Sequence, residues 1–413
     1  DPPNILLTNP EMLHLSIMPH HHLWQEFLSG LDFVVLDEVH TYRGITGSNM
    51  AWVFRRLLRI CRYYRADPTF IFCSATVGNP GELAHKLTGL KVESVEGNGS
   101  PRGKKHFLLL NPLTGPAQSG LALLQAALRR GLRTIVYSQS RKMTELIALW
   151  SAKQCPEYAK RISAYRSGFL PEERRDIEAR LADGRILAVI TTSALELGID
   201  IGSLDICILL GYPGSIMATW QRSGRVGRQQ QESGIILLGM ENSLDQYFMA
   251  NPRAFFRLQP ENAVLNPFNP VIMQSQLKCA ALDLPLDRQE DLLAGDEIQG
   301  VVDSLEEDGG LVPGESGQRL FCPWKDFARQ VNLRGAGSQL SIVNESSRRS
   351  IGSIDFYRAH HETHPGAVYL HRGRTFVITS LQPEQSRVWA EAKKVNYFTR
   401  VRREKQTEIL QQT

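Results

Sequence analysis

Short, uninterrupted apolar runs recur through the first 250 residues, and helical stretches separate them. Such runs predict strands of a parallel sheet buried on both faces, because a half-exposed strand alternates apolar and polar side chains. In residues 1–105 the predicted strands are 5–7, 33–36 and 70–73. In residues 106–250 they are 134–137, 186–190, 206–210 and 235–238, with a helix at 171–182. The chain is therefore predicted to be an α/β protein with two parallel-sheet domains of doubly wound type.

The pattern changes after residue 250. A helix is predicted from Pro270 to about Leu282, and Ile298, Val301, Val302 and Leu305 then recur at helical spacing before a Gly309-Gly310 turn. This order predicts a winged-helix-like domain at 251–315. Residues 316–413 are strand-rich, and 367–378 predict an antiparallel hairpin. The expected domains are thus 1–105, 106–250, 251–315 and 316–413, with a linker at 96–105.

The net charge of +4 says little about partners, but its distribution says more. Residues 317–413 hold 16 Lys and Arg against 8 Asp and Glu, whereas 251–316 hold 4 against 12. The basic segment is either a phosphate-binding surface or a solvated face. No apolar run is long enough to span a bilayer, and the six cysteines form no C-x-x-C pair. We expect a cytoplasmic protein, associated with the nucleoid if the source is bacterial.

Carboxylates and hydroxyls follow two predicted strands of the first domain. Asp37-Glu38-Val39-His40 comes directly after the strand 33–36, and Ser74-Ala75-Thr76 ends the next strand. Adjacent acids at a strand end supply a metal ligand and a carboxylate that orients an attacking water, as phosphoryl transfer to water requires. Adjacent acids also occur by chance, and a Ser/Thr turn can simply cap a helix.

The segment Gln221-Arg222-Ser223-Gly224-Arg225-Val226-Gly227-Arg228 is the most specific signal in the chain. Two arginines three residues apart, each preceded by glycine, suit the stabilisation of a phosphate in the transition state. A basic surface helix would not explain those glycines. Upstream, Thr191-Thr192 follows a strand, and Gly198 and Asp200 come soon after. Consecutive hydroxyls can bond the phosphates of a nucleic-acid strand, although a capped helix start gives the same pattern.

Taken in order, these motifs resemble motifs II, III, V and VI of superfamily 2 helicases. The segment 8–13 is similar to motif Ib, and 136–141 is similar to motif IV. The resemblance implies two RecA-like domains, the first of them incomplete, with ATP bound between them. Residues 251–413 resemble the region after motif VI in DEAD/DEAH-box DNA helicases of the mitomycin repair factor A and Hrq type. Matching segments are 266–270, 331–334, 351–355, 364–371 and 396–399.

The resemblance implies a role for each motif residue. Asp37 would hold Mg²⁺ through water, and Glu38 would orient the attacking water. The remaining catalytic residues would be His40, which couples hydrolysis to domain movement, and Gln221, Arg225 and Arg228, which face the γ-phosphate. The ATP-binding residues would be Gly198, Asp200, Ser74 and Thr76. The residues that touch the DNA backbone would be Thr8, Ser138, Arg141 and Thr191.

The same resemblance implies an ATP-dependent helicase or translocase with 3′→5′ polarity, linked to DNA repair. Its partners would be single-stranded DNA and DNA with a single-stranded tail. Two departures from the family stand out: these residues contain no G-x-x-x-x-G-K-[ST] phosphate loop and no four-cysteine zinc site. We therefore expect an internal fragment of a longer protein, with negligible ATPase activity by itself. A non-catalytic nucleic-acid-binding module and an RNA helicase stay open as alternatives.

Overall fold

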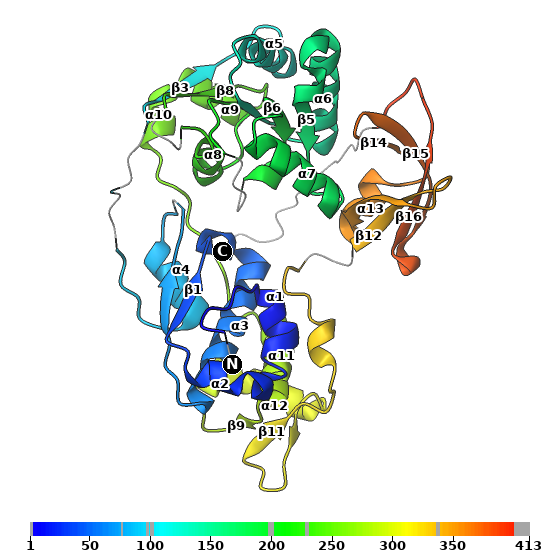
Figure 1. Ribbon diagram of the computed structural model, residues 1–413. Coiled ribbons are helices and arrows are strands. Elements are labelled where there is room, and N and C mark those ends of the chain that lie inside the picture. The colour runs from blue at the N-terminus through cyan, green and yellow to red at the C-terminus, as the bar shows by residue number, and fades with distance from the viewer. Residues whose placement is uncertain are drawn as a thin grey trace, which may run out of the picture. The chain divides into compact units, whose positions relative to one another are not determined.

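The computed structural model describes residues 3–75, 77–95, 99, 103–196, 202–227, 231–335 and 339–399. The chain divides into two compact units, each formed by two separate stretches of sequence. Unit 1 comprises residues 1–99 and 258–335, and unit 2 comprises residues 100–257 and 336–413. Figure 1 shows the elements of each unit. The units are described separately below.

Unit 1 is built around one long helix, α3 (Gly44–Tyr63), most of whose side chains are buried. Two parallel strands, β1 (Phe33–Leu36) and β2 (Thr69–Phe72), flank it in sequence and pair in register from Phe33↔Thr69 to Leu36↔Phe72. Helix α4 (Pro80–Thr88) packs on α3. The short helices α1 (Pro10–Met12) and α2 (Gln25–Ser29) precede the sheet. Gly47 is required near the start of α3, because a Cβ there would lie 2.4 Å from the Tyr42 carbonyl oxygen.

The second stretch of unit 1 packs on the other side of α3. Helices α11 (Pro270–Asp283) and α12 (Asp296–Glu307) are followed by a small antiparallel sheet in the order β10-β11-β9. Its strands are β9 (Leu286–Asp287), β10 (Val312–Pro313) and β11 (Arg319–Phe321). The predicted pair of helices and the turn after them are confirmed. Since β11 lies beyond residue 315 yet pairs with β9, this sheet crosses the predicted boundary between the last two domains.

Unit 2 contains a six-stranded parallel sheet in the order β3-β8-β7-β4-β6-β5. The strands are β3 (Lys105–Leu110), β4 (Thr134–Tyr137), β5 (Ile162–Tyr165), β6 (Ala188–Thr191), β7 (Ile206–Leu210) and β8 (Ser233–Leu238). The helices are α5 (Pro116–Arg129), α6 (Arg141–Gln154), α7 (Pro171–Ala182), α8 (Ile216–Ser223), α9 (Ser243–Ala250) and α10 (Pro252–Arg257). The predicted parallel α/β domain is confirmed.

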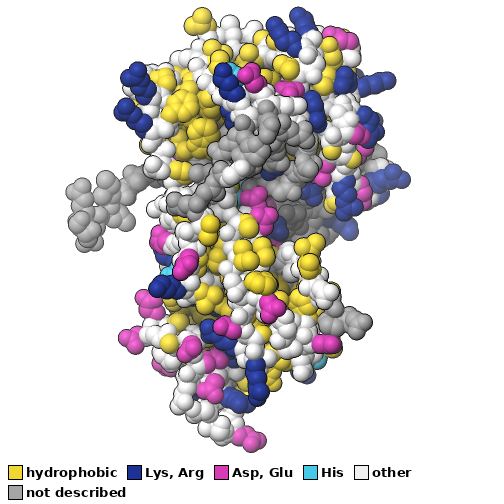
Figure 2. Space-filling model, turned by 60° about the vertical axis from the view of Figure 1, so that its left-hand side comes forward, with side chains coloured by type: hydrophobic (Ala, Val, Ile, Leu, Met, Phe, Trp, Pro, Cys, Tyr) yellow, Lys and Arg dark blue, Asp and Glu magenta, His cyan; other side chains and the backbone are white. Residues whose placement is uncertain are grey.

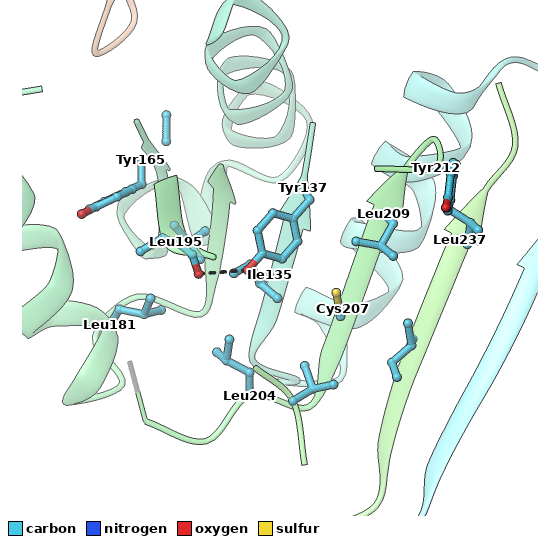
Figure 3. Packing of buried hydrophobic residues seen from close by; sticks show 14 of the residues in the cluster. Ile135, Tyr137, Tyr165, Leu181, Leu195, Leu204, Cys207, Leu209, Tyr212 and Leu237 are labelled. Atoms are coloured by element: carbon cyan, nitrogen blue, oxygen red, sulfur yellow. Dashed lines mark hydrogen bonds between the residues drawn. The ribbon is translucent and has the colours of Figure 1, made fainter. Parts of the chain in front are cut away.

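Alternate residues of these strands enter two different cores, as a doubly covered sheet requires. Tyr137, Cys207 and Leu209 face a cluster that also contains α7, α8, α9 and α10 (Figure 3). Their neighbours Val136, Ile208 and Leu210 face a second cluster with α5 and α6. Both faces of the sheet are therefore buried, which is why its strands are continuous apolar runs in the sequence.

The rest of unit 2 is a five-stranded sheet in the order β13-β12-β16-β15-β14. Its strands are β12 (Gln339–Asn344), β13 (Ser350–Asp355), β14 (Val368–His371), β15 (Arg374–Gln382) and β16 (Arg387–Ala392), and helix α13 (Phe356–Glu362) follows β13. The predicted hairpin at 367–378 is confirmed by the β14–β15 pairing. Buried Arg166, after β5, donates to the Leu370 carbonyl and the Tyr369 hydroxyl and joins this sheet to the six-stranded one.

Two other predictions differ from the structure. Residues 5–7 do not form a strand, and none of the described strands pairs with them. Ile5 and Leu7 are therefore left 80% and 93% exposed. The predicted linker at 96–105 lies largely outside the described residues, and its last residue already belongs to β3. Among the described residues, no helix combines the length and apolar character needed to cross a bilayer.

A buried polar network fastens α11 to α3. The Arg56 guanidinium is 1% exposed and forms two hydrogen bonds with Asp283, of 2.8 and 3.0 Å. Arg56 also donates to Nδ1 of His14 at 2.9 Å, so the ring proton of His14 is on Nε2, which donates to the Ala328 carbonyl. Burial and the nearby Arg56 charge lower the pKa of His14 to about 4.

This network predicts a loss of stability in acid. The unfolded chain protonates His14 near pH 6.5 and the folded chain only near pH 4, so the unfolded state binds more protons between these values. The free energy of unfolding should fall by on the order of 3 kcal/mol as the pH drops through this window. Urea unfolding at several pH values measures it. His14→Gln, whose amide can keep both hydrogen bonds without titrating, should reduce the dependence, and an unchanged dependence would contradict the assignment.

Candidate functional site

The two acidic residues after β1 are held by an unusual backbone conformation. Glu38 has φ 51° and ψ 42°, a left-handed conformation that is uncommon outside glycine. Its N–H donates to Oδ1 of Asp37 at 2.8 Å. Strain of this kind persists where the surroundings impose it and is concentrated at functional sites. The Asp37 side chain is exposed and the Glu38 side chain is 37% exposed, so both carboxylates are accessible at the strand end.

His40 connects this acidic pair to the segment after β2. Its side chain is 2% exposed, and its Nδ1 accepts a hydrogen bond from the Ala75 N–H at 3.2 Å. The proton of the neutral ring is therefore on Nε2, which lies 3.5 Å from Oε2 of Glu38. Ser74 lies beside this contact, and its hydroxyl donates to the Ala75 carbonyl. The structure thus brings Glu38, His40 and Ser74 together, while Thr76 lies outside the described residues.

Two predicted DNA-contacting hydroxyls lie at the carboxyl ends of neighbouring strands in unit 2. Thr191 ends β6 and pairs with Tyr137 of β4, and the N–H of Ser138 donates to the Thr191 carbonyl at 2.8 Å. The Ser138 hydroxyl donates to the Ser140 carbonyl and lies 2.7 Å from the Thr144 hydroxyl. The Thr191 hydroxyl is buried and has no hydrogen-bond partner among the described residues. Both hydroxyls therefore lie inside the fold.

The structure pairs two arginines, Arg222 at the end of α8 and Arg225 just after it, with a residue outside the predicted set of site residues. Arg225 is 5% exposed and donates to the Glu196 carbonyl at 2.6 Å. Arg222 forms a 3.0 Å ion pair with the Glu196 carboxylate. In the sequence, Glu196 is distinguished only by its position, as an acidic residue inside the segment 191–200. It joins this segment to the arginine segment.

Tyr137 contacts the same cluster. Its hydroxyl donates to the Leu195 carbonyl at 3.1 Å, the dashed contact in Figure 3. The Arg222 guanidinium lies over its ring, 5.2 Å from the centroid. Burial raises the pKa of Tyr137, so the hydroxyl stays protonated and remains a donor. The hydroxyl thereby holds the residue that precedes Glu196, and the ring contacts Arg222, the ion-pair partner of Glu196.

The glycines of the arginine segment allow close approaches of the backbone. Gly227 has φ 69°, and a Cβ there would lie 2.5 Å from the Ser233 hydroxyl oxygen. At Gly224, where α8 ends, a Cβ would lie 3.1 Å from the Trp220 carbonyl oxygen. Beside them, Nε2 of Gln221 is buried without a hydrogen-bond partner among the described residues. Gly198, Asp200 and Arg228 lie outside the described residues.

The remaining predicted DNA contacts lie on different units. Thr8, in unit 1, is exposed and precedes Asn9, whose side chain caps α1. Arg141, in unit 2, is the first residue of α6, and its guanidinium donates to the Ser167 hydroxyl at 3.2 Å. Burial and the charges of Arg358 and Arg166 lower the pKa of Arg141. Arg141 therefore lies where positive charge is concentrated.

The two units carry opposite net charge. Unit 1 holds 14 Lys and Arg against 23 Asp and Glu, whereas unit 2 holds 33 against 20. Figure 2 shows the charged side chains on one face of the molecule, with Lys and Arg in dark blue and Asp and Glu in magenta. The basic segment 317–413 is itself divided between the units. Unit 2 is therefore the part whose charge suits a phosphate backbone.

Comparisons with known proteins agree with this distribution of motifs. The DEAD/DEAH box helicase family matches residues 1–83, and the helicase conserved C-terminal domain matches residues 119–230. The uncharacterized ATP-dependent helicase YprA of Bacillus subtilis is 39% identical over 96% of this chain and 55% of its own length. The ATP-dependent helicase HRQ1 of Saccharomyces cerevisiae is 30% identical over 96% of this chain and 39% of its own.

A solved structure adds the agreement of the fold. The DUF1998 helicase MrfA bound to DNA and AMPPNP superposes with a TM-score of 0.88 at 39% identity, over 95% of this chain and 56% of that one. This chain belongs to the superfamily 2 DEAD/DEAH-box helicases, of the same type as MrfA and Hrq1. The chain spans only part of the length of these curated relatives, 55% of YprA and 39% of HRQ1. The resemblance found from the sequence motifs is confirmed.

Proposed function

We propose that this chain is part of the motor of an ATP-dependent DNA helicase or translocase. The observation that carries the proposal is the connection from the Glu38 carboxylate through buried His40 to the backbone of Ala75. Glu38 is the carboxylate proposed to orient water for phosphoryl transfer. Through His40 it is linked to the segment after β2, which would respond to the state of this carboxylate. The names of the relatives support the same activity, since YprA and HRQ1 are both described as ATP-dependent helicases.

ATP is the proposed substrate of the motor. Asp37 suits water-mediated Mg²⁺ binding because its side chain is exposed and one carboxylate oxygen accepts the Glu38 N–H. The chemistry that Mg²⁺ would supply at Asp37 is neutralisation of charge on the phosphates. Glu38 would orient the attacking water. Ser74, Thr76, Gly198 and Asp200 are proposed to line the nucleotide site.

The arginine segment is proposed to stabilise charge on the γ-phosphate. Gln221, Arg225 and Arg228 would face it, and fixed guanidinium groups are well suited to this because they need no reorganisation during the reaction. The Glu196 carbonyl holds the Arg225 guanidinium at 2.6 Å and supports such pre-organisation. Nε2 of Gln221 is buried without a hydrogen-bond partner in the described part of the chain, and it is a donor available to a phosphate oxygen.

Single-stranded DNA is the proposed partner, gripped through its phosphates. The charge of unit 2 favours this partner, and the related helicase MrfA has been crystallised bound to DNA. Thr8 and Arg141 are the accessible members of the proposed contact set. Ser138 and Thr191, whose hydroxyls are buried, would shape the same strand ends or contact DNA through the backbone.

A salt titration tests the backbone grip at Arg141. Each phosphate contact on a single strand contributes about 0.7 to the slope of log affinity against log salt. Arg141→Gln should therefore lower that slope by about 0.7 for an oligonucleotide of any sequence. Fluorescence anisotropy at several salt concentrations measures it. Arg129→Gln, at an exposed arginine of α5, is the matched control and should leave the slope unchanged. A slope equal to the wild-type value in Arg141→Gln would remove Arg141 from the contact set.

Strand displacement by the intact protein tests the function as a whole. A duplex with a 3′ single-stranded DNA tail should be unwound in the presence of ATP and Mg²⁺, and a duplex with a 5′ tail should not. The same tails in RNA separate the alternative of an RNA helicase. Failure to unwind any duplex, with tight DNA binding retained, would favour a translocase or a non-catalytic binding module.

A further inference from the structure

Unit 2 contains a cavity of about 970 Å³, and most of the residues that line it lie outside the motor motifs. We call it the α6 cavity. Residues of α6, α13 and β14 line it. Residues 395–399, which follow β16, complete the wall. Its volume lies within the range of small-molecule sites in proteins.

Positive charge exceeds negative charge in the lining. Arg141, Lys142, Arg166 and Arg358 line the cavity together with a single carboxylate, Glu362. Arg166 is paired with Glu145 at 3.1 Å, and Arg358 with Glu362 at 2.6 Å. Arg141 has no carboxylate within 4.0 Å in the described part of the chain, and its guanidinium contacts the Ser167 hydroxyl. An anion would therefore meet an uncompensated guanidinium here.

Helix α6 adds to this field. It has 14 residues, and Ser140 caps it by accepting the Met143 N–H at 3.1 Å. Ser140, Arg141 and Lys142 all line the cavity, so the positive end of the helix dipole borders it. The uncompensated guanidinium of Arg141 and the helix end favour the same kind of group, a phosphate.

Aromatic rings form much of the remaining wall. Trp150, Tyr369, Tyr397 and Phe398 line the cavity. Tyr397 and Phe398 are held although they are 48% and 70% exposed. The Lys142 ammonium lies 4.0 Å from the centre of the Phe398 ring, and the Val368 N–H donates to the Thr399 hydroxyl at 3.0 Å. Exposed rings fixed beside cations are the surfaces on which unstacked bases bind.

We propose that the α6 cavity takes one unstacked nucleotide of a single-stranded nucleic acid, with its base on the aromatic wall and its phosphate at Arg141. The inference rests on the proposed function, because it requires a protein that handles single strands. It goes beyond a phosphate contact at Arg141, since it assigns a base-binding wall to residues outside all motor motifs. An acidic peptide would use the cations but would leave the aromatic wall without a matching group.

Paired oligonucleotides test the proposal on the intact protein. One is an ordinary labelled single strand, and the other has the same length and phosphates but abasic sugars. Phe398→Ala and Tyr397→Ala should each weaken binding of the ordinary strand about tenfold, as expected for the loss of one stacked base. Both should change binding of the abasic strand by less than about twofold, because that strand has no bases to stack. Arg141→Ala should weaken binding of both strands, because both carry the phosphate.

Three controls complete the test. Tyr247→Ala removes a ring of similar exposure, 52%, from α9 outside the cavity and should change neither affinity. Phe398→Trp keeps an aromatic ring at this position and should bind the ordinary strand as the wild type does. If Phe398→Ala acted only by disturbing the fold, this difference between the two variants would not be expected. Deoxyadenosine monophosphate, the same chemistry without a strand, should compete only at concentrations far above those of the oligonucleotide.

The possible outcomes separate the two claims. Phe398→Ala could weaken binding of both strands equally, or weaken binding of neither although the wild type binds both. Either result would overturn the proposed nucleotide site in the α6 cavity and leave the helicase proposal intact. Competition by the mononucleotide as tight as the oligonucleotide would overturn the strand-borne form of the proposal. A wild-type protein that binds neither strand would overturn the proposed function and the cavity together.

Discussion

Replacing Glu38 with glutamine in the intact protein is expected to lower ATP hydrolysis by about three orders of magnitude, within the range for loss of a positioned acid–base group. The amide keeps the shape of the side chain and its contact with His40, at 3.5 Å in the wild type, but cannot act as a base. ATP and DNA binding should therefore be retained. Phosphate release in single turnover with saturating single-stranded DNA measures the loss, and anisotropy measures binding.

A matched replacement distinguishes the general effect of losing one negative charge from the specific loss of the Glu38 carboxylate. Glu26→Gln removes one carboxylate from an exposed position of α2 in the same unit and should leave hydrolysis unchanged. If Glu38→Gln lowered hydrolysis by less than about tenfold, the carboxylate would not orient the attacking water. If it abolished ATP binding as well, its role would be structural.

Arg228→Ala should lower hydrolysis by on the order of 10³-fold, the loss expected when a guanidinium that stabilises transferred phosphate is removed. The effect should fall on kcat rather than on the affinity for ATP, because the charge it stabilises develops in the transition state. Steady-state ATPase of the intact protein with saturating DNA measures both. Arg253→Ala, at an exposed arginine of α10, is the control. A loss below about tenfold in Arg228→Ala would assign Arg228 a structural role.

The sequence predicted four of the six strands of the parallel sheet in unit 2 and missed β3 and β5. The structure has the predicted bounds for β4, β7 and α7. These elements are the easiest to predict, because a strand buried on both faces is a continuous apolar run and α7 begins with proline. The segment 5–7 is equally apolar but is not a strand, because strand formation depends on a neighbour that the local sequence does not contain.

Buried charges were the main features that the sequence could not predict. Arg56 and Asp283 are 227 positions apart, and each resembles an ordinary surface charge until α11 packs on α3. Glu196 and Arg222 are 26 positions apart, and their pairing likewise appears only when the fold brings them together. Motif spacing singled out Glu38, His40 and Ser74 as candidate site residues but did not predict the link between His40 and the segment after β2, because the hydrogen bond that fixes the His40 tautomer comes from the backbone of Ala75.

The α6 cavity shows the same limit on a larger scale. Its lining comes from α6, α13, β14 and residues 395–399, which are far apart in the sequence. The sequence indicated only that 317–413 is basic, and whether that balance faces DNA or solvent stays a prediction. The proposed domain boundaries and motif-residue roles likewise stay predictions.

Nucleic-acid-stimulated ATPase of the intact protein tests the central claim most directly. Hydrolysis should be slow without nucleic acid and should rise strongly with single-stranded DNA of any sequence, with a smaller rise for RNA of the same length. The rise should disappear in Glu38→Gln. Hydrolysis that single-stranded DNA does not stimulate, or that RNA stimulates more strongly than DNA, would contradict a DNA-dependent motor built on these motifs.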